Sequence, residues 1–573
     1  MESSAWQARV ADVLWLLLWG VASSAWCVTA ADHIGATFDE PLYVQHGLER
    51  WRSGSMARLM KLGTMPLPVD VQTLPLYLWE RWRGTPIDPQ HELHLVLPYA
   101  RAATLFFWWL LLVHVGLAAR SLGGRRAAAL AVAFVACEPV LVAHAGLATT
   151  DVAVTACLVA LAYHFRQNRT ARWGWRVAWP ALWLGLSVLA KASGLVFGGI
   201  ILLLIEADRC GWWRRREGEP APPSWRASLG DLVQIGGLGL VLMFVYCGCD
   251  WRTNGSFQAW ARGLPEGPTA SAMVWLSDHL RIFSNGGEGI VRQVTHNLRG
   301  HGVYLLGRTD PRSLWWYFPV LMTLKFSVPV LLAPLAWLGL RRLAPRRGPW
   351  YGNWALLCAL ALLAFSVTCR VQIGVRFMFP LLCLAVIGTV AALTRCLDGA
   401  ASAWRWRLLA GGAAACLAWN VTQALTVWPE GLCYVNPLWG GTREGYRLTS
   451  DSNYDWGQGI TELAAWLRSH PQPDLDVYYF GTDPAYFELP ARPVALNGLP
   501  VASRDEACNY LRGRRLAVST TVLYGNFTAP GLADVVAVLR ASRPVDRTTT
   551  FLIYDFTDGP ARDSRQAAAT GPQ

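Results

Sequence analysis

Two adjacent carboxylates, Asp39 and Glu40, stand in the stretch GATFDEPLYVQHG, directly after the first long apolar run of the chain. A third, Asp151, opens a later apolar run in AHAGLATTDVAVT. An ionisable group within a membrane span costs about 2.5–3.5 kcal/mol, so each one in or beside such a run is a candidate for function. We take all three as candidate catalytic groups. The alternatives are an N-cap role for Asp151 and, for Glu40, orientation of its neighbour or of the backbone.

Cations lie in or beside the same apolar runs. They are Arg101, Lys191, Lys325, Arg370 and Arg376. Lys325, in WWYFPVLMTLKFSVP, lies one to two turns inside its run, whereas Lys191 and Arg376 have the alternative of snorkelling to lipid headgroups. His301 and Tyr304, in HGVYLLG, precede the run of Lys325. His301 has the alternative of an ordinary hydrogen-bonding loop histidine.

Carboxylates and cations at one membrane surface suit the transfer of a glycosyl group from a lipid-linked phosphate. Lys and Arg can neutralise the phosphate that leaves, and a carboxylate can take the proton of the attacking acceptor. The five cations are therefore candidate ligands of the donor phosphate, and His301 and Tyr304 are candidate substrate-binding residues. No Walker-type lysine loop and no convincing G-x-G-x-x-G occurs. No metal site is predicted, and a divalent cation stays open, because no tight His/Asp/Glu ligand spacing appears.

The elements that must position these residues are apolar helices. Of the 573 residues, 53% are hydrophobic and only 16% are charged, whereas soluble proteins carry about 25% charged residues. Most of the apolar runs approach the roughly 20 residues that a bilayer crossing takes. They occupy 11–31, 102–119, 127–143, 152–165, 177–190, 194–205, 229–248, 314–338, 353–369, 377–394 and 408–427. We expect a mainly α, polytopic membrane bundle of about 11 spans, whose first run is retained because Glu2 and Asp12 spoil a basic signal-peptide start.

The distribution of Lys and Arg predicts the topology. One set of loops holds three to five of them each and comprises 120–126, 166–176, 206–226, 341–347 and 395–407. The turns on the other side, 138–150, 191–193 and 370–376, hold none to two. By the positive-inside rule the first set and the N-terminus are cytoplasmic, and the C-terminus lies outside. The net charge of +12, in short clusters between apolar runs, fits orientation in a bilayer and not nucleic-acid binding.

The outer face then holds loops 32–98 and 250–313 and the segment 428–573. A helix is predicted from the spacing of the apolar residues Ile460, Leu463, Ala464 and Leu467. Asp455 and Gln458 precede it at capping-box spacing. Strand-like runs follow in LDVYYFG, RRLAVSTTVLY and TTTFLIYDF. We expect a transmembrane domain at 1–427, a small extracytoplasmic α/β domain at 428–557 and a disordered tail at 558–573.

Six blocks of this sequence resemble, in order, a known enzyme family. They are FDEPLYVQHG, GLATTDVAVT, LGLSVLAKASGLV, HGVYLLGRTDPRSLWWYFPVLMTLKFSVP, GVRFMFPL and YVNPLWGGTREGYRLTSDSNYDWGQGITELAAWL. Over about 1–470 the chain resembles bacterial polyprenyl-phosphate-dependent glycosyltransferases, relatives of the protein O-mannosyltransferases and lipid A aminoarabinose transferases with GT-C architecture. The resemblance implies inverting transfer from a polyprenyl-phosphate sugar on the periplasmic side of the bacterial inner membrane. The block DSNYDWGQ is the most distinctive, and its role is not derivable from the sequence.

The resemblance also implies roles for single residues. Asp39 is implied as the general base or acceptor-positioning group, with Glu40 in support. Asp151 matches the family's second outer acidic residue, and Lys191 matches its outer-hairpin lysine. Lys325 matches its span-eight lysine, and Arg376 matches the arginine of its G-x-R-[FY] block. Many relatives carry a His-Pro-Pro-like block where this chain reads LGTMPLPVDVQTLPLYL, without histidine. This departure weighs against a metal or acceptor contact there and indicates a divergent subgroup with its own acceptor.

The leading hypothesis is thus an integral membrane glycosyltransferase with a polyprenyl-phosphate-linked sugar as donor and a protein, lipid or glycan as acceptor, surrounded by membrane lipid. A transporter or flippase of a lipid-linked saccharide is the alternative. Transporters often show repeated halves with broken helices at the bilayer midplane, and this sequence shows no such repeat. A catalytically inactive relative that binds a partner through its C-terminal domain is the third reading. Retention of Asp39, Asp151 and both lysines weighs against it.

Overall fold

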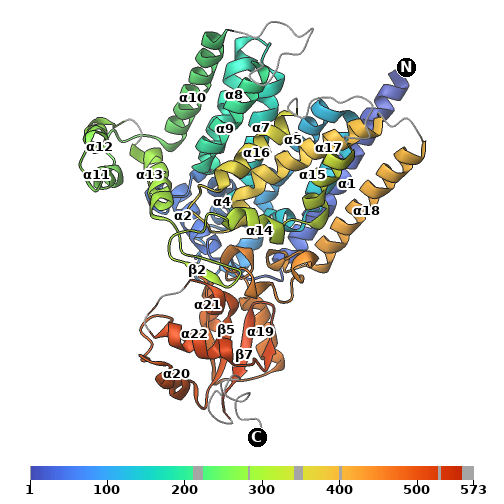
Figure 1. Cartoon of the computed structure of the whole chain (residues 1–573). Coiled ribbons are helices and arrows are strands. Elements are labelled where there is room, and N and C mark those ends of the chain that lie inside the picture. The colour runs from blue at the N-terminus through green and yellow to red at the C-terminus, as the bar shows by residue number, and fades with distance from the viewer. Residues whose placement is uncertain are drawn as a thin grey trace.

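The chain folds into a helical bundle with a smaller α/β part at one end (Figure 1). The computed structural model describes residues 2–210, 224–281, 284–340, 353–398, 403–526, 529 and 531–557. The tail predicted at 558–573 lies outside these residues. The N-terminus and the α/β part lie at opposite ends of the molecule (Figure 1). A mainly α chain with a small C-terminal sheet domain agrees with the predicted fold class.

The bundle helices follow the eleven predicted apolar runs. They are α1 (Glu2–Ala31), α5 (Leu93–Ala136), α6 (Pro139–Ala145), α7 (Asp151–Gln167), α8 (Trp179–Ala190), α9 (Ser193–Arg209), α10 (Trp225–Cys247), α14 (Tyr317–Lys325), α15 (Val328–Leu340), α16 (Trp354–Ser366), α17 (Phe379–Asp398) and α18 (Ala403–Thr426). Two predicted runs are joined in α5, which is broken at Gly124 with φ 77° and ψ −165°. Glycine adopts such a positive φ without the steric cost that a Cβ would bring.

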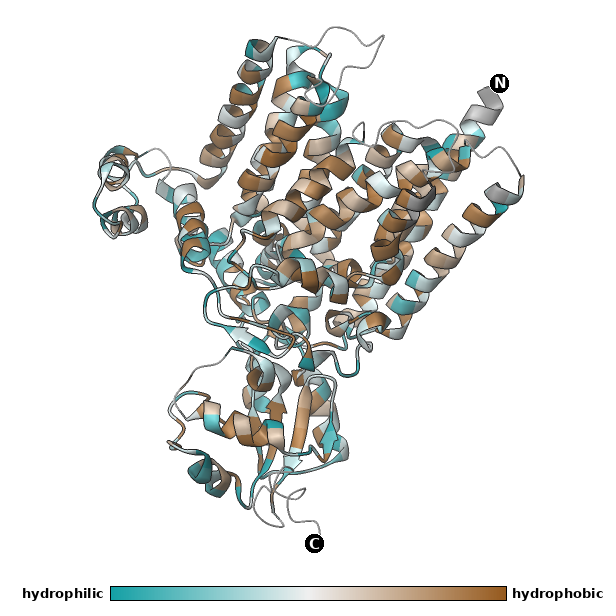
Figure 2. Cartoon of the chain, in the orientation of Figure 1, coloured by the Kyte–Doolittle hydropathy of each residue, from teal (hydrophilic) through white to brown (hydrophobic). Residues whose placement is uncertain are grey.

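Five helices in the described part of the chain are long and apolar enough to cross a membrane, and the pair α14 and α15, bent by 114°, makes up to six. The remaining runs form helices of 12 to 17 residues, α7, α8, α9 and α16, shorter than the about 20 residues of a full crossing. The number of eleven spans therefore stays a prediction. Large apolar side chains are exposed along the outer helices α1, α10 and α18, which Figure 2 shows as largely hydrophobic. A multi-pass membrane protein accounts for these apolar surfaces.

Short elements surround the bundle on the side of the α/β part. After α1 come α2 (Glu40–Ser53), α3 (Ala57–Lys61) and α4 (Pro66–Arg83), and α2 packs on α4. After α10 come α11 (Gly255–Arg262), α12 (Pro268–His279), α13 (Ser284–Arg299) and the antiparallel strands β1 (Val303–Leu305) and β2 (Arg308–Asp310). In the second group, β2 lies at the junction with the α/β part, whereas α11 and α12 lie at the side of the bundle, away from that junction (Figure 1).

The α/β part is a five-stranded mixed sheet of order β4-β3-β5-β7-β6. Its strands are β3 (Leu475–Tyr478), β4 (Arg492–Pro493), β5 (Arg515–Ser519), β6 (Asp546–Arg547) and β7 (Phe551–Asp555). β3 pairs parallel with β4 and β5, and β7 pairs antiparallel with β5 and β6. Alternate residues of β5 and β7 enter two separate apolar clusters. One cluster contains α19 (Ile460–Ser469), and the other contains α20 (Arg504–Leu511) and α22 (Leu532–Ala541).

Two local predictions in the α/β part are wrong. The end of RRLAVSTTVLY is not strand but the helix α21 (Thr520–Tyr524). The predicted capping box at α19 is absent, because the N-cap is Gly459 and no side chain caps the helix. Asp455 Oδ2 instead accepts hydrogen bonds from Ser519 Oγ and from the backbone N–H of Thr521, the latter at 3.0 Å. The carboxylate thus ties down the point where β5 turns into α21.

Candidate active site

Four charged residues from distant parts of the chain form one ion network. Lys191 Nζ donates to Asp151 Oδ1 at 2.6 Å. Arg376 Nη1 lies 3.3 Å from Asp39 Oδ2 and 3.5 Å from Asp151 Oδ2. The convergence that the sequence predicts for these two carboxylates and two cations is therefore present.

Helix and hairpin ends position the network. Asp39 is the N-cap residue of α2, Asp151 is the first residue of α7, and Lys191 connects α8 to α9 in extended backbone. Arg376 lies in the 3₁₀ turn η3 (Val375–Met378) that leads into α17. The carboxylate of Asp151 makes no N-capping hydrogen bond and binds the two cations instead, so the N-cap alternative is not what the structure shows.

Burial distinguishes the two carboxylates. The Asp151 side chain is 1% exposed, whereas that of Asp39 is 25% exposed and also accepts a long hydrogen bond from Tyr43 Oη at 3.4 Å. The cations lie on aromatic rings, Arg376 Cζ 4.0 Å from the Trp456 ring centre and Lys191 Nζ 4.0 Å from that of Phe377. Such contacts hold a cation by the ring's negative face. Asp39 is thus the accessible carboxylate of the network, and Asp151 is shielded from solvent.

A cavity of about 520 Å³ opens beside Asp39 and Arg376, where the bundle meets the α/β part. Other residues of its wall come from several separate regions of the chain and include Phe38, His301, Tyr304, Tyr317, Asp451, Trp456, Phe480 and Thr521. Both predicted substrate-binding residues, His301 and Tyr304, therefore line the same cavity as Asp39. A small polar molecule or the end of a larger one fits such a volume.

The two predicted substrate-binding residues are already hydrogen-bonded. Tyr304 Oη donates to the carbonyl of Arg447 at 2.6 Å. His301 Nδ1 lies 3.1 Å from His296 Nε2. Burial, together with His296 and Arg376, lowers the pKa of His301 to about 4, so this imidazole is neutral at physiological pH. His301 can therefore offer a neutral ring to the cavity but not a positive charge.

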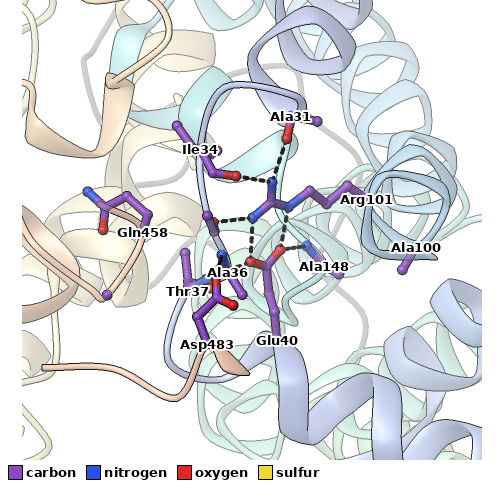
Figure 3. A network of polar contacts seen from close by, with 12 residues as sticks. Ala31, Ile34, Ala36, Thr37, Glu40, Ala100, Arg101, Ala148, Gln458 and Asp483 are labelled. Atoms are coloured by element: carbon purple, nitrogen blue, oxygen red, sulfur yellow. Dashed lines mark hydrogen bonds and ion pairs between the residues drawn. The ribbon is translucent and has the colours of Figure 1, made fainter. Parts of the chain in front are cut away.

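Glu40 and Arg101 are placed differently from their predicted roles (Figure 3). Glu40 is fully buried and Arg101 nearly so, and they form a two-pronged ion pair at 2.9 and 2.7 Å. The remaining Arg101 donors bind the carbonyls of Ala31, Ile34 and Gly35, which leaves no N–H for a phosphate.

Glu40 also accepts hydrogen bonds from two backbone N–H groups, those of Thr37 at 2.9 Å and Ala148 at 2.8 Å. Burial opposes its ionisation, but Arg101 and these N–H groups together hold the pKa of Glu40 below its usual range. The pair joins the loop before α2 to the loop before α7. We therefore correct the catalytic role of Glu40 and the phosphate role of Arg101 to the positioning of Asp39 and Asp151.

Two further cations also depart from the predicted phosphate site. Lys325 is buried, and its Nζ donates to the carbonyls of Leu432 at 2.9 Å, Asn453 at 2.6 Å and Tyr434. An ammonium group has three donors, so none is left for a ligand. Arg370 is not in the cavity wall, and its guanidinium points to the carbonyl of Leu298 at 3.4 Å. Of the five predicted phosphate ligands, only Lys191 and Arg376 belong to the network.

Sequence reasoning missed Asp451 and Trp456. Asp451 lines the cavity with the unusual positive φ of 56°, and burial raises its pKa to about 6. Both residues lie in DSNYDWGQ, which the sequence singles out without a role. Within the described ranges, no group of three or more His, Cys, Asp or Glu side chains is arranged to hold a metal ion.

Comparisons with known proteins give similarity at the level of solved structures. No protein-family model matches the sequence, and no curated protein sequence matches it. ArnT from Cupriavidus metallidurans bound to undecaprenyl phosphate is similar with a TM-score of 0.45 and 16% identity, covering 98% of this chain and 99% of that one. The Archaeoglobus fulgidus oligosaccharyltransferase tethered with an acceptor peptide has a TM-score of 0.45 and 12% identity, covering 94% of this chain and 74% of that one. At these values, function must be derived from the site itself.

Proposed function

We propose that this chain is an integral membrane glycosyltransferase that moves a sugar from a polyprenyl-phosphate donor to an acceptor at the outer, periplasmic face of a bacterial inner membrane. The observation that carries the proposal is the network of Asp39, Asp151, Lys191 and Arg376 on a cavity. On this proposal residues 1–427 form the transmembrane domain with a cytoplasmic N-terminus, and 428–557 form the extracytoplasmic domain.

The network suits a single displacement at the anomeric carbon. The acceptor's oxygen or nitrogen forms the new bond to that carbon while Asp39 takes its proton. The bond from the carbon to the phosphate oxygen breaks, and its electron pair stays on the phosphate, which leaves as polyprenyl phosphate. Attack opposite the leaving group inverts the configuration of the sugar.

Charge balance links the two halves of this step. Two carboxylates and two cations give the resting network no formal net charge. When Asp39 takes the proton, the network gains one positive charge, because Arg376 loses one of its two counter-ions. The leaving phosphate gains negative charge at the same moment, so the stabilisation is larger in the transition state than in the ground state.

The test compares Asp39→Asn with wild type. Purified protein in detergent is incubated with polyprenyl-phosphate sugars and candidate acceptors, and release of polyprenyl phosphate is measured. Removal of a general base should lower turnover at least about 100-fold. Asp32→Asn is the matched control, because Asp32 is an exposed carboxylate seven residues earlier on the same loop, and it should turn over like wild type.

Turnover of Asp39→Asn near the wild-type rate would remove Asp39 from the mechanism. The flippase alternative is tested in parallel with protein reconstituted into vesicles. Transbilayer movement of the lipid-linked sugar without cleavage of its bond to phosphate would favour the flippase and contradict the transferase.

A further inference from the structure

The block DSNYDWGQ, residues 451–458, lies at the junction of the bundle and the α/β part and contacts both. On the α/β side, Asp455 accepts the hydrogen bonds from Ser519 and Thr521 described above. On the bundle side, the block reaches the segment before Arg376 and the loop before Asp39. A segment that contacts both the α/β part and the bundle can fix the loop of Asp39 and the turn of Arg376 relative to one another.

The backbone before Arg376 is hydrogen-bonded on both sides of Gly374. Ser452 Oγ donates to the carbonyl of Ile373. Asn453 Oδ1 accepts the N–H of Val375 at 2.8 Å. Gly374 between them has a φ of 123°, and a Cβ there would collide with Ser452 Oγ. Only glycine fits this place, which explains the glycine of the G-x-R block in physical terms.

Asn453 and Lys325 anchor the block to α14. Asn453 Nδ2 donates to Tyr317 Oη at 3.0 Å, and the Asn453 carbonyl accepts from Lys325 Nζ at 2.6 Å. The other two donors of Lys325 bind the carbonyls of Leu432 and Tyr434. The buried ammonium group thus has a complete set of partners. It links α14 to three points of the connecting segment, residues 427–459, which joins α18 to α19.

Trp456 contacts both Arg376 and the loop that carries Asp39. Its ring lies under the Arg376 guanidinium, 4.0 Å from Cζ. Its carbonyl accepts the N–H of Phe38 at 2.8 Å, next to Asp39. Two residues further on, the carbonyl of Gln458 accepts the N–H of Gly35 at 2.8 Å. The block therefore fixes the loop that carries the base as well as the cation beside it.

We propose that residues 451–458 form a clamp that aims Arg376 between Asp39 and Asp151, with Trp456, Asn453 and Ser452 as positioning residues. The inference rests on the proposed transfer reaction and assigns a role in it to the DSNYDWGQ block. Lys325 belongs to the anchor of this clamp and not to the phosphate site.

The experiment uses Trp456→Leu and Trp456→Phe in the full-length protein. Two quantities are measured in detergent: kcat/KM for release of polyprenyl phosphate and the affinity for polyprenyl phosphate itself. Loss of a partly desolvated cation–π contact should lower both about tenfold in Trp456→Leu. Trp456→Phe keeps a ring face and should stay within about threefold of wild type. Trp439→Leu, at a more exposed tryptophan of the same connecting segment, is the control and should not change either quantity.

A folded Trp456→Leu protein that equals wild type in both measurements would overturn the clamp, as would Trp456→Phe that is as impaired as Trp456→Leu. If Trp456→Leu does not fold, Ser452→Ala decides the question, because it removes only the bond to Ile373. It should lower kcat/KM with an unchanged melting temperature, and wild-type kinetics in Ser452→Ala would refute the clamp. If wild type binds polyprenyl phosphate but transfers no sugar, the proposed function fails while the binding measurements still test the clamp.

Discussion

The buried ion pair of Glu40 and Arg101 allows a sharp test of the positioning argument. Both side chains are at most 2% exposed. Removing one partner of a buried pair costs about 3–5 kcal/mol, because the other charge stays behind without compensation. In Glu40→Gln the Arg101 guanidinium keeps its three carbonyl partners, so we expect the lower end, about 3 kcal/mol.

Arg101→Met should cost more than Glu40→Gln. It leaves the carboxylate of Glu40 buried with only two backbone N–H donors and removes the donors of three carbonyls at once. We expect about 5 kcal/mol. The matched control is Glu92→Gln in the pair Arg83–Glu92, whose contact is 2.7 Å but whose side chains are 22% and 28% exposed. A solvent-accessible pair of this kind contributes little to stability, so Glu92→Gln should stay close to wild type.

The assay is the free energy of unfolding in mixed micelles, followed by tryptophan fluorescence, with turnover measured on the same samples. Per folded molecule, Glu40→Gln should lose far less turnover than the at least about 100-fold expected for Asp39→Asn, since no substrate can reach Glu40. The reasoning is refuted if Glu40→Gln is no less stable than Glu92→Gln. It is also refuted if folded Glu40→Gln is as inactive as Asp39→Asn, because Glu40 would then act in the chemistry itself.

Three further predictions concern the junction. Burial raises the pKa of Asp451 from 3.8 to about 6, so the stability that goes with its protonated form is complete below about pH 4 and lost as the pH rises through 6. Above pH 6, Asp451→Asn should therefore be more stable than wild type by up to about 3 kcal/mol and should have the higher melting temperature. Below pH 4 the two proteins should have the same melting temperature. The same melting temperature at pH 8 would contradict this prediction. Burial likewise raises the pKa of Glu430 from 4.5 to about 8, so the melting temperature of Glu430→Gln should begin to exceed that of wild type above about pH 4.5, and the difference should grow until about pH 8. Gly374→Ala should lower turnover and melting temperature together, whereas Gly411→Ala, in α18 with open space around its Cβ position, should lower neither.

The charged network was predictable because each member interrupts or borders an apolar run. Asp39, Asp151, Lys191 and Arg376 stand out for this reason, and a shared membrane surface is the simplest place for them to meet. The same logic misassigned Lys325 and Arg101. All the partners of Lys325, and three of the five acceptors of Arg101, are backbone carbonyls, which every residue carries and which no pattern of side chains can reveal.

The clamp could not be predicted for a related reason. Asn453 and Val375 are 78 residues apart in the sequence. Trp456 and Arg376 are in contact, but α17 and α18 separate them in the sequence. Local pattern reading placed α19 correctly from its apolar spacing but assigned Asp455 to its N-terminus. The Asp455 carboxylate instead accepts hydrogen bonds from residues of β5 and α21. Short-range propensity thus gave way to long-range hydrogen bonding.

Asp451 and Trp456 form part of the cavity wall beside Asp39. The order in which the chain is synthesised therefore determines when this cavity can form. Chains are made from the N-terminus, so the bundle can enter the bilayer before the last quarter of the chain has emerged. Until that portion arrives and docks, the turn carrying Arg376 lacks its hydrogen bonds to Ser452 and Asn453. On the proposed function, a chain that ends before residue 451 lacks these hydrogen bonds and should not transfer sugar from the lipids around it.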